Sequence, residues 1–153
     1  MYTVAGGSAY NGSYIYSHHT GAGSGIAAAS TNASYAMTAN LLPPAANATD
    51  DGYQVGFTFT GNQYGPWYMD VVVPDFYSST SPVTIGGSNP PDTDGYFFGG
   101  NGLYWNSTGF FGWAICTASY DVPQLFAITN NATNLACSCV PVYLYSVPAP
   151  NPA

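Results

Sequence analysis

The stretch YQVGFTFT, residues 53 to 60, alternates apolar and polar side chains with a period of two. Its apolar positions are Tyr53, Val55, Phe57 and Phe59, and its other positions are Gln54, Gly56, Thr58 and Thr60. Successive side chains of a β-strand point to opposite faces, so all four apolar residues fall on one face of an extended chain. The stretch therefore predicts a half-buried strand.

Similar runs predict strands over most of the chain. Stronger runs cover residues 67–73, 95–98, 110–116, 124–129 and 139–147, and weaker ones cover 2–5, 13–17, 25–30 and 34–39. Segments rich in Gly, Pro, Asn and Asp, which favour turns, separate many of them. The best helical candidate, Ala-rich residues 25–42, lacks the long side chains and charge pairs of a stable surface helix. Many short strands between turns predict an all-β fold, an antiparallel sandwich or barrel.

The length of 153 residues fits one domain. We expect a single β domain over residues 1–147 and a Pro-rich, extended tail over residues 148–153. Pro141 lies inside the last apolar run and indicates an edge strand or a bulge there. The N-terminus has neither the basic nor the apolar region of a signal peptide, and one interpretation is that Met1 precedes an already trimmed chain.

Charge is almost absent from this sequence. It contains no Lys, Arg or Glu, and seven Asp give a formal net charge of −7. Without cations the chain cannot neutralise phosphate groups, which excludes the usual electrostatic binding of nucleic acids and of anionic membranes. The chain is 46% hydrophobic and 16% aromatic, so we expect it to fold. Something other than charge must then keep its surface soluble.

Sequons for N-glycosylation offer such a source of solubility. Glycans at Asn-x-Ser/Thr sites are bulky and solubilising, and they lie on surface loops. Five such sites occur, at Asn11, Asn32, Asn47, Asn106 and Asn131. We therefore expect an N-glycosylated protein that is secreted by a eukaryotic cell.

The three cysteines are Cys116, Cys137 and Cys139. A catalytic thiol needs a nearby base or cation, but the chain has no Lys or Arg and its two histidines lie far away in the sequence. The Cys-x₂₋₄-Cys spacing of zinc sites is also missing. In the oxidising compartment of a secreted protein, thiols pair. We predict a disulfide from Cys116 to Cys137 or Cys139, which share one face of a strand and are not separated by these arguments.

Four segments of the C-terminal third, residues 94–105, 109–116, 123–133 and 139–147, resemble the closing section of secreted fungal cell-wall proteins of the PhiA type. In that family an apolar strand ending in Cys is followed by a Gln-hydrophobic-Phe-Ala strand, matched here by Gln124, Phe126 and Ala127. A second Cys then precedes alternating apolar residues, so the resemblance implies that Cys139 is the partner of Cys116. The segment SAYNGSYIYSHHTG, residues 8–21, resembles the family's opening strand and turn.

The resemblance implies a secreted or wall-associated β protein without a known reaction, and it transfers no catalytic residue. The sequence departs from the family pattern in its third cysteine, its lack of basic residues and its Tyr-rich middle.

Aromatic side chains are the most promising candidates for a binding site. Amphipathic aromatics on loops can stack on sugar rings while nearby Asn and Asp bind hydroxyl groups. The candidate sugar-contacting residues are Tyr64 and Trp67, around a Gly-Pro turn, and Tyr104 and Trp105, directly before a sequon. Trp113 lies in the strand that leads to Cys116, and we expect it in the core.

The titratable residues suggest no strong site. His18 and His19 are adjacent, so in a strand they point to opposite faces and do not readily bind one ion. The segment DTDG, residues 92–95, begins like a calcium loop, but Leu103 stands where that loop needs Glu. Asp70 is the one Asp inside an apolar strand and is the candidate acid of a hydrolase. We expect no metal, no cofactor and no catalytic residue.

The sequence thus favours a non-enzymatic, secreted and N-glycosylated structural protein of a cell wall or another extracellular layer. The alternatives are a carbohydrate-binding module, a self-assembling filament or layer subunit with associating Tyr-rich faces and edge strands, and a small Asp-dependent hydrolase. Extracellular polysaccharide and further copies of the chain are the expected partners, and nucleic acids and membranes are not.

Overall fold

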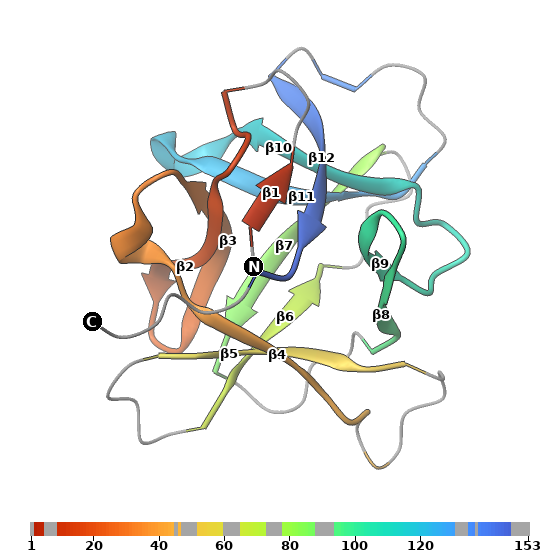
Figure 1. Cartoon of the computed structure of the whole chain (residues 1–153). Helices are drawn as coiled ribbons and strands as arrows, with labels where there is room; N and C mark the ends of the chain where they lie inside the picture. Colours follow the sequence, from red (N-terminus) through yellow and green to blue (C-terminus); the bar gives the residue numbers. More distant parts are fainter. Residues whose placement is uncertain are drawn as a thin grey trace.

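The computed structural model describes residues 9–44, 46, 52–59, 65–72, 78–87, 94–130, 135–136 and 138–147, and the backbone of residues 2–4. Strands dominate this part of the chain (Figure 1). They are β1 (Tyr2–Val4), β2 (Tyr14–Gly21), β3 (Ser24–Ser30), β4 (Thr38–Leu42), β5 (Gln54–Thr58), β6 (Trp67–Val71), β7 (Thr80–Gly86), β8 (Tyr96–Gly99), β9 (Gly102–Trp105), β10 (Gly112–Thr117), β11 (Pro123–Ile128) and β12 (Cys139–Tyr145).

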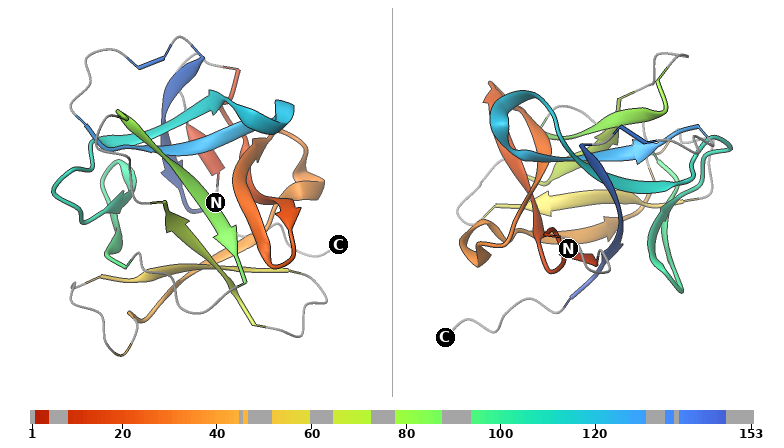
Figure 2. Two further views of the ribbon diagram at one scale, coloured as in Figure 1. Left: turned by 180° about the vertical axis from the view of Figure 1, so that it is seen from behind. Right: turned by 90° about the horizontal axis from the view of Figure 1, so that it is seen from above.

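Ten strands form one antiparallel sheet in the order β10-β12-β1-β2-β3-β11-β7-β6-β5-β4. Because β10 pairs with both β12 and β11, the sheet curls back on itself into a half-barrel (Figure 2). Strand β7 pairs with both β3 and β11, and β6, β5 and β4 extend the sheet from there. Strands β8 and β9 form a separate hairpin, connected to the start of β5 by a bridge between Tyr53 and Tyr96. The prediction of an all-β antiparallel fold is confirmed.

Helical structure in the described residues consists of two short 3-10 turns, η1 (Ala33–Tyr35) and η2 (Ser119–Asp121). Thus the predicted strand at 34–39 is wrong in its first half, where η1 stands and where Asn32 accepts a hydrogen bond from the Ser34 amide. No helix in the described ranges is long and apolar enough to span a membrane.

The core fills the concave side of the curled sheet, and the hairpin β8–β9 packs against it. Trp113 is 2% exposed, which confirms its predicted place in the core. Its indole Nε1 donates a 2.7 Å hydrogen bond to the Leu103 carbonyl of β9. Gly102, with φ +102°, faces β12 so closely that a Cβ atom would collide with the Leu144 carbonyl. The hairpin is therefore held against both β10 and β12.

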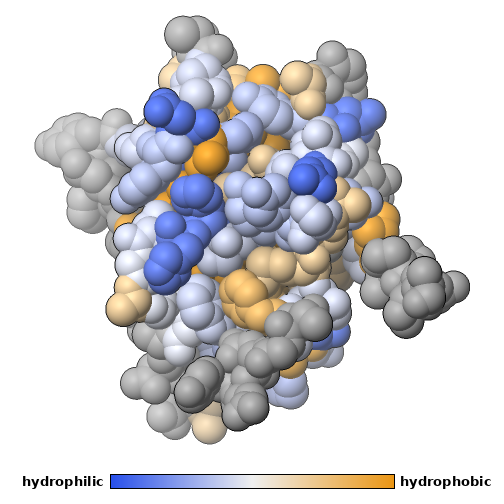
Figure 3. Space-filling view, turned by 90° about the vertical axis from the view of Figure 1, so that its left-hand side faces the viewer, coloured by the Kyte–Doolittle hydropathy of each residue, from blue (hydrophilic) through white to orange (hydrophobic). Residues whose placement is uncertain are grey.

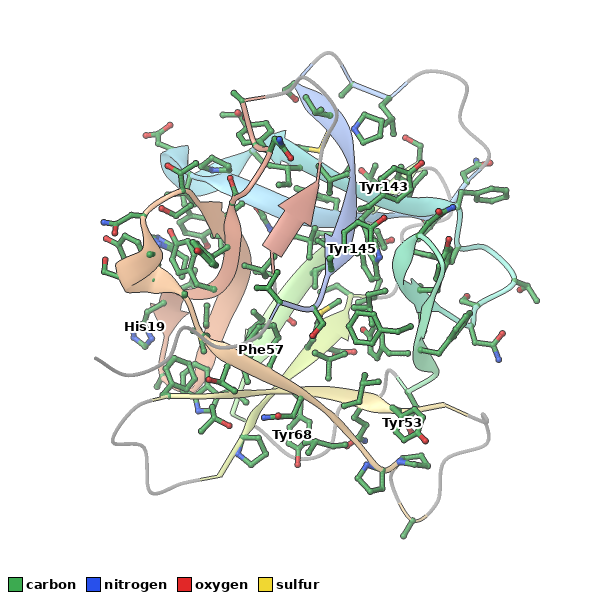
Figure 4. All side chains as sticks on the ribbon, in the orientation of Figure 1. His19, Tyr53, Phe57, Tyr68, Tyr143 and Tyr145 are labelled. Atoms are coloured by element: carbon green, nitrogen blue, oxygen red, sulfur yellow. A yellow bond between two sulfur atoms is a disulfide. The ribbon has the colours of Figure 1, made fainter. Side chains whose placement is uncertain are left out.

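The centre of β5 is buried on both faces, whereas the sequence predicted a half-buried strand. Phe57 lies in the interior, as expected (Figure 4). Gln54, however, is only 4% exposed, and Gly56 on the same face is also buried. A Cβ atom at Gly56 would collide with the Leu42 side chain and lie 3.1 Å from Pro66. Neighbouring segments thus cover the face that was expected to meet solvent.

The predicted disulfide joins Cys116 and Cys139, with an S–S distance of 2.05 Å. The two residues are direct register partners on β10 and β12, and their Cα atoms are 4.0 Å apart. The pairing implied by the family resemblance is confirmed, and Cys137 lies outside the described residues. Pro141 pairs with β10 on one side, whereas β1 begins its pairing with β12 only at Tyr143. Strand β12 nevertheless lies between β10 and β1, and its described pairings contain no bulge, so the prediction that Pro141 marks an edge strand or a bulge is wrong. Proline fits there because the described pairing of β1 does not reach it.

Candidate binding surface

Four aromatic side chains follow one another on the face that carries β2 and η1. We call Tyr35, Tyr16, His18 and Tyr120 the aromatic row. The rings of Tyr35 and Tyr16 stack at 4.8 Å, and the centroids of Tyr16 and His18 are 6.3 Å apart. The ring of His18 in turn lies 6.3 Å from that of Tyr120. The row thus joins three separate segments of the chain: β2, η1 and the loop between β10 and β11.

The alternation of side chains along β2 explains the position of two members of the row, Tyr16 and His18. Ile15 is fully buried, and the Ser17 hydroxyl on the same face donates to the Ile85 carbonyl at 3.0 Å. Tyr16 and His18 therefore point to the opposite, outer face. On the other side of the row, η1 holds Tyr35 over Tyr16. The row remains accessible, because Tyr35 is 50% and Tyr120 is 59% exposed.

Tyr120 has an unfavourable backbone conformation for its residue type. Its φ is +72° and that of Asp121 is +53°, so two consecutive non-Gly residues are left-handed. Turns of this kind favour Gly, Asn and Asp. A bulky residue there costs about 1–2 kcal/mol. The ring of Tyr120 buries little surface in return, which suggests that it serves something other than stability.

The aromatic row is polar but nearly uncharged. Burial raises the pKa of Tyr16, and the neighbouring Tyr35 raises it further. The Tyr16 hydroxyl therefore stays protonated at neutral pH. The visible face around β2 and η1 mixes polar and small apolar areas (Figure 3). Such a surface suits a ligand with a flat apolar face and hydroxyl groups at its rim.

The three candidate sugar-contacting residues that the structure describes lie on two different strands, β6 and β9, and have different neighbours. Trp67 begins β6, is half-buried, contacts Phe59 at 4.7 Å and lies against the backbone of Gly87. Tyr104 and Trp105 belong to β9, not to a loop as expected. Their side chains alternate: Trp105 donates from Nε1 to the Asp94 carbonyl at 3.0 Å, and Tyr104 stacks on Phe97. Tyr64 lies outside the described residues.

The remaining candidates lie apart from the row. His19 is exposed at the far end of β2, and its side chain points away from the sheet (Figure 4). Asp70 sits on β6 opposite Thr84 and is half-buried. Of the segment 92–95, only Asp94 and Gly95 are described. Within the described residues, no three His, Cys, Asp or Glu side chains gather as a metal site would require.

Tyr96 is fully buried, and within the described part of the chain its hydroxyl has no hydrogen-bond partner. Burial raises the pKa of Tyr96 well above its ordinary value of 10.0, and the charges of Asp70 and then Asp94 raise it further. The side chain of Tyr96 is therefore neutral in the folded protein.

This raised pKa predicts a loss of stability at alkaline pH. Below pH 10.0 Tyr96 is neutral in the folded and the unfolded chain, so its contribution is fully present. Above that pH only the unfolded chain releases the proton, and the free energy of unfolding falls by about 1.4 kcal/mol per pH unit. We expect Tyr96→Phe to remove this part of the slope and to change stability at neutral pH by less than about 1 kcal/mol. Urea unfolding at several pH values measures both.

The matched control is Tyr53→Phe, because Tyr53 pairs with Tyr96 but is 50% exposed. This variant should retain the alkaline slope of the parent. Equal slopes in the parent and in Tyr96→Phe would contradict the burial of a neutral Tyr96.

Three of the five predicted glycosylation sites lie in the described residues. Asn11 occupies a turn, Asn32 precedes η1, and Asn106 follows β9, and all three are exposed. Asn47 and Asn131 lie outside the described residues.

Sequence reasoning did not find the aromatic row. The alternation of Tyr14, Tyr16 and His18 places three rings on one face of a predicted strand, and that signal was available. Tyr35 and Tyr120 join them only through the folded structure.

Comparison with known proteins identifies a family but no function. No curated protein and no solved structure is significantly similar to the chain. One family model matches residues 2–148, which is nearly the whole chain. The chain therefore belongs to the family described as Domain of unknown function (DUF7907).

Proposed function

We propose that the protein is a secreted, N-glycosylated, non-enzymatic structural domain of a cell wall or another extracellular layer. The observation that carries this proposal is the Cys116–Cys139 disulfide, because such bonds form and persist in oxidising compartments. The exposure of Asn11, Asn32 and Asn106 is compatible with glycosylation. The resemblance of the C-terminal third to cell-wall proteins of the PhiA type points in the same direction.

Intact mass of protein from a eukaryotic secretory host tests this proposal. Deglycosylation should remove sugar mass, and reduction should add two hydrogens at Cys116 and Cys139. Peptides must be made with a protease that cuts at aromatic residues, because the chain contains no Lys or Arg for trypsin. Three free thiols on a chain without sugar would refute the proposal.

The aromatic row favours a second function, the binding of a neutral polysaccharide. The four rings follow one another in a row, with Tyr16 and Tyr35 stacked and the next two pairs inclined at 79° and 51°. An organic cation, in contrast, is held by aromatic faces that converge around it. Anionic polysaccharides are disfavoured, since the chain has a net charge of −7 and no cation. Neutral sugar rings combine an apolar face with hydroxyl groups and match the half-exposed tyrosines of the row.

We expect Tyr120→Asn to separate binding from stability. Asn tolerates the left-handed backbone better than Tyr, so the variant should gain about 0.5–1 kcal/mol in the free energy of unfolding. It should also bind linear neutral oligosaccharides of glucose or N-acetylglucosamine about five- to tenfold more weakly, since a stacking ring is lost. Urea unfolding and titration calorimetry with these sugars measure the two effects.

Tyr143→Thr is the control, because Tyr143 is 53% exposed but lies on β12, outside the row (Figure 4). This variant should bind sugar like the parent. If Tyr120→Asn bound as tightly as the parent, or if the parent bound none of these sugars, the row would not be a polysaccharide site.

A further inference from the structure

The outer face of the hairpin β8–β9 carries a stacked pair of aromatic rings. Phe97 and Tyr104 are register partners, and their rings stack at 5.5 Å with an interplanar angle of 16°. The inner face of the hairpin is formed by Tyr96, Leu103 and Trp105, which are buried in or packed on the core. Phe97 is 42% exposed. An apolar ring so exposed on a regular strand is a candidate for contact with a partner group.

The sequon residue Asn106 directly follows β9, two positions after Tyr104. Its amide donates a 2.8 Å hydrogen bond to the Gly95 carbonyl, so Asn106 continues the ladder of β8 and β9 by one pair. Side chains two residues apart on a strand share a face, which places the Asn106 side chain on the side of Tyr104. Beside it, the hydrogen bond from Trp105 Nε1 to the Asp94 carbonyl holds the end of the hairpin. The backbone of Asn106 is therefore held at the end of the hairpin by its bond to Gly95 and by the turn that the Ser107 amide closes on the Trp105 carbonyl.

The register of the hairpin decides which of the two rings is the neighbour of Asn106. Tyr104 leans toward the hairpin turn, since a Cβ atom on Gly99 would lie 2.9 Å from its Cε2. Phe97 stacks on Tyr104. Asn106 is the diagonal cross-strand neighbour of Phe97, a separation that long side chains and their attachments span.

We propose that the Phe97–Tyr104 pair is a packing site for the chain's own N-glycan, and that the first N-acetylhexosamine on Asn106 lies on the exposed face of Phe97. This inference rests on the glycosylation proposed above. In the covalent step, the Asn106 amide nitrogen loses a proton and takes C1 of the sugar from a lipid-pyrophosphate oligosaccharide, and the lipid pyrophosphate leaves. A sugar tethered this close has a high effective concentration at the ring, which favours it over any free ligand.

A double-mutant cycle on glycosylated protein tests the contact. Thr108→Ala removes the sequon without changing Asn106, and Phe97→Ala removes the ring. We expect the glycan to raise the thermal midpoint by about 2–4 °C when Phe97 is present and to have no effect in Phe97→Ala. An N-acetyl methyl proton signal of the sugar should also show a ring-current shift in the parent. That shift should disappear in Phe97→Ala. It should also disappear in Phe97→Leu, which retains an apolar side chain and serves as the test variant if Phe97→Ala folds poorly.

Two controls make the cycle specific. Phe98 is also 42% exposed but is one residue further along β8, on the opposite face, so Phe98→Ala should leave the effect of the glycan intact. Ser34→Ala removes the sequon of Asn32 in the same way as Thr108→Ala, and its effect should be independent of Phe97. The same variants refolded from a bacterial host, without sugar, should show no coupling between residues 97 and 108.

The outcomes separate this inference from the function on which it rests. Occupied Asn106 without coupling to Phe97 and without a shifted methyl signal would overturn the packing site alone. Occupied sites elsewhere with Asn106 empty would overturn it too. A chain without sugar at every sequon would overturn the proposed glycosylation itself.

Discussion

Replacing Trp113 with alanine should lower the free energy of unfolding by about 3–5 kcal/mol, the largest effect expected of a single substitution here. The side chain is 2% exposed, and its ring contacts Phe110 at 4.8 Å and Tyr96 at 6.4 Å. Its indole also donates to the Leu103 carbonyl at 2.7 Å. Alanine would leave a cavity where β10 meets the hairpin β8–β9, together with an unsatisfied carbonyl. Urea unfolding followed by circular dichroism measures the loss.

The effect should be large because the hairpin is not part of the main sheet. Among the described residues, its backbone pairing with the sheet is the bridge between Tyr53 and Tyr96, so side chains contribute much of what holds it in place. A domain of this size is stabilised by about 5–15 kcal/mol in total. Trp113→Ala would therefore remove a substantial part of the stability and would loosen the hairpin first.

Two variants divide the effect into its parts. Trp113→Phe keeps most of the buried ring but loses the hydrogen bond, and should cost about 1–3 kcal/mol. Trp105→Ala removes a second indole that also donates to a backbone carbonyl of this region, but from a half-buried position, and should cost less than Trp113→Ala. A cost below about 1 kcal/mol for Trp113→Ala would show that the hairpin does not depend on this residue.

Local alternation predicted most strands but not their arrangement. The stretches at 53–60, 67–73 and 139–147 each contain a strand of the structure, because their period of two reflects local backbone geometry. Strand β7 was not predicted, since its sequence TSPVTIG has only Val83 and Ile85 as large apolar residues. Its remaining inward position is Ser81, whose buried hydroxyl lies 3.3 Å from that of Thr129. Polar pairs of this kind leave no signal in a hydrophobic pattern.

The sequence also revealed less of the binding surface than of the fold. Trp67 and Trp105 were candidates because of residue type and nearby turns, yet both are half-buried by packing that depends on distant residues. The aromatic row needs the β10–β11 loop to place Tyr120 near His18, over a hundred positions away in the chain. Nor does a pattern of residue types reveal that Tyr120 has a left-handed backbone. Long-range pairing decides all of these features.

Removing the disulfide should lower the free energy of unfolding by about 3 kcal/mol. Cys116 and Cys139 are 23 residues apart, and the bond between them restricts the unfolded chain by closing a loop of that size. The double variant Cys116→Ala, Cys139→Ala suits the test, because Cys116 is 4% exposed and alanine fits its buried site. Urea unfolding of this variant and of the reduced parent should give similar losses.

Cys137→Ala is the control, and it should unfold like the parent and keep the mass of an oxidised pair. If Cys137→Ala were destabilised as much as the double variant, while Cys139→Ala alone were not, the bond in solution would join Cys116 to Cys137. The expected result also bears on the redox conditions in which the fold is stable. A loss of about 3 kcal/mol from a total of about 5–15 kcal/mol leaves a reduced chain with a much larger unfolded fraction. The domain would then be more stable under oxidising conditions than under reducing ones.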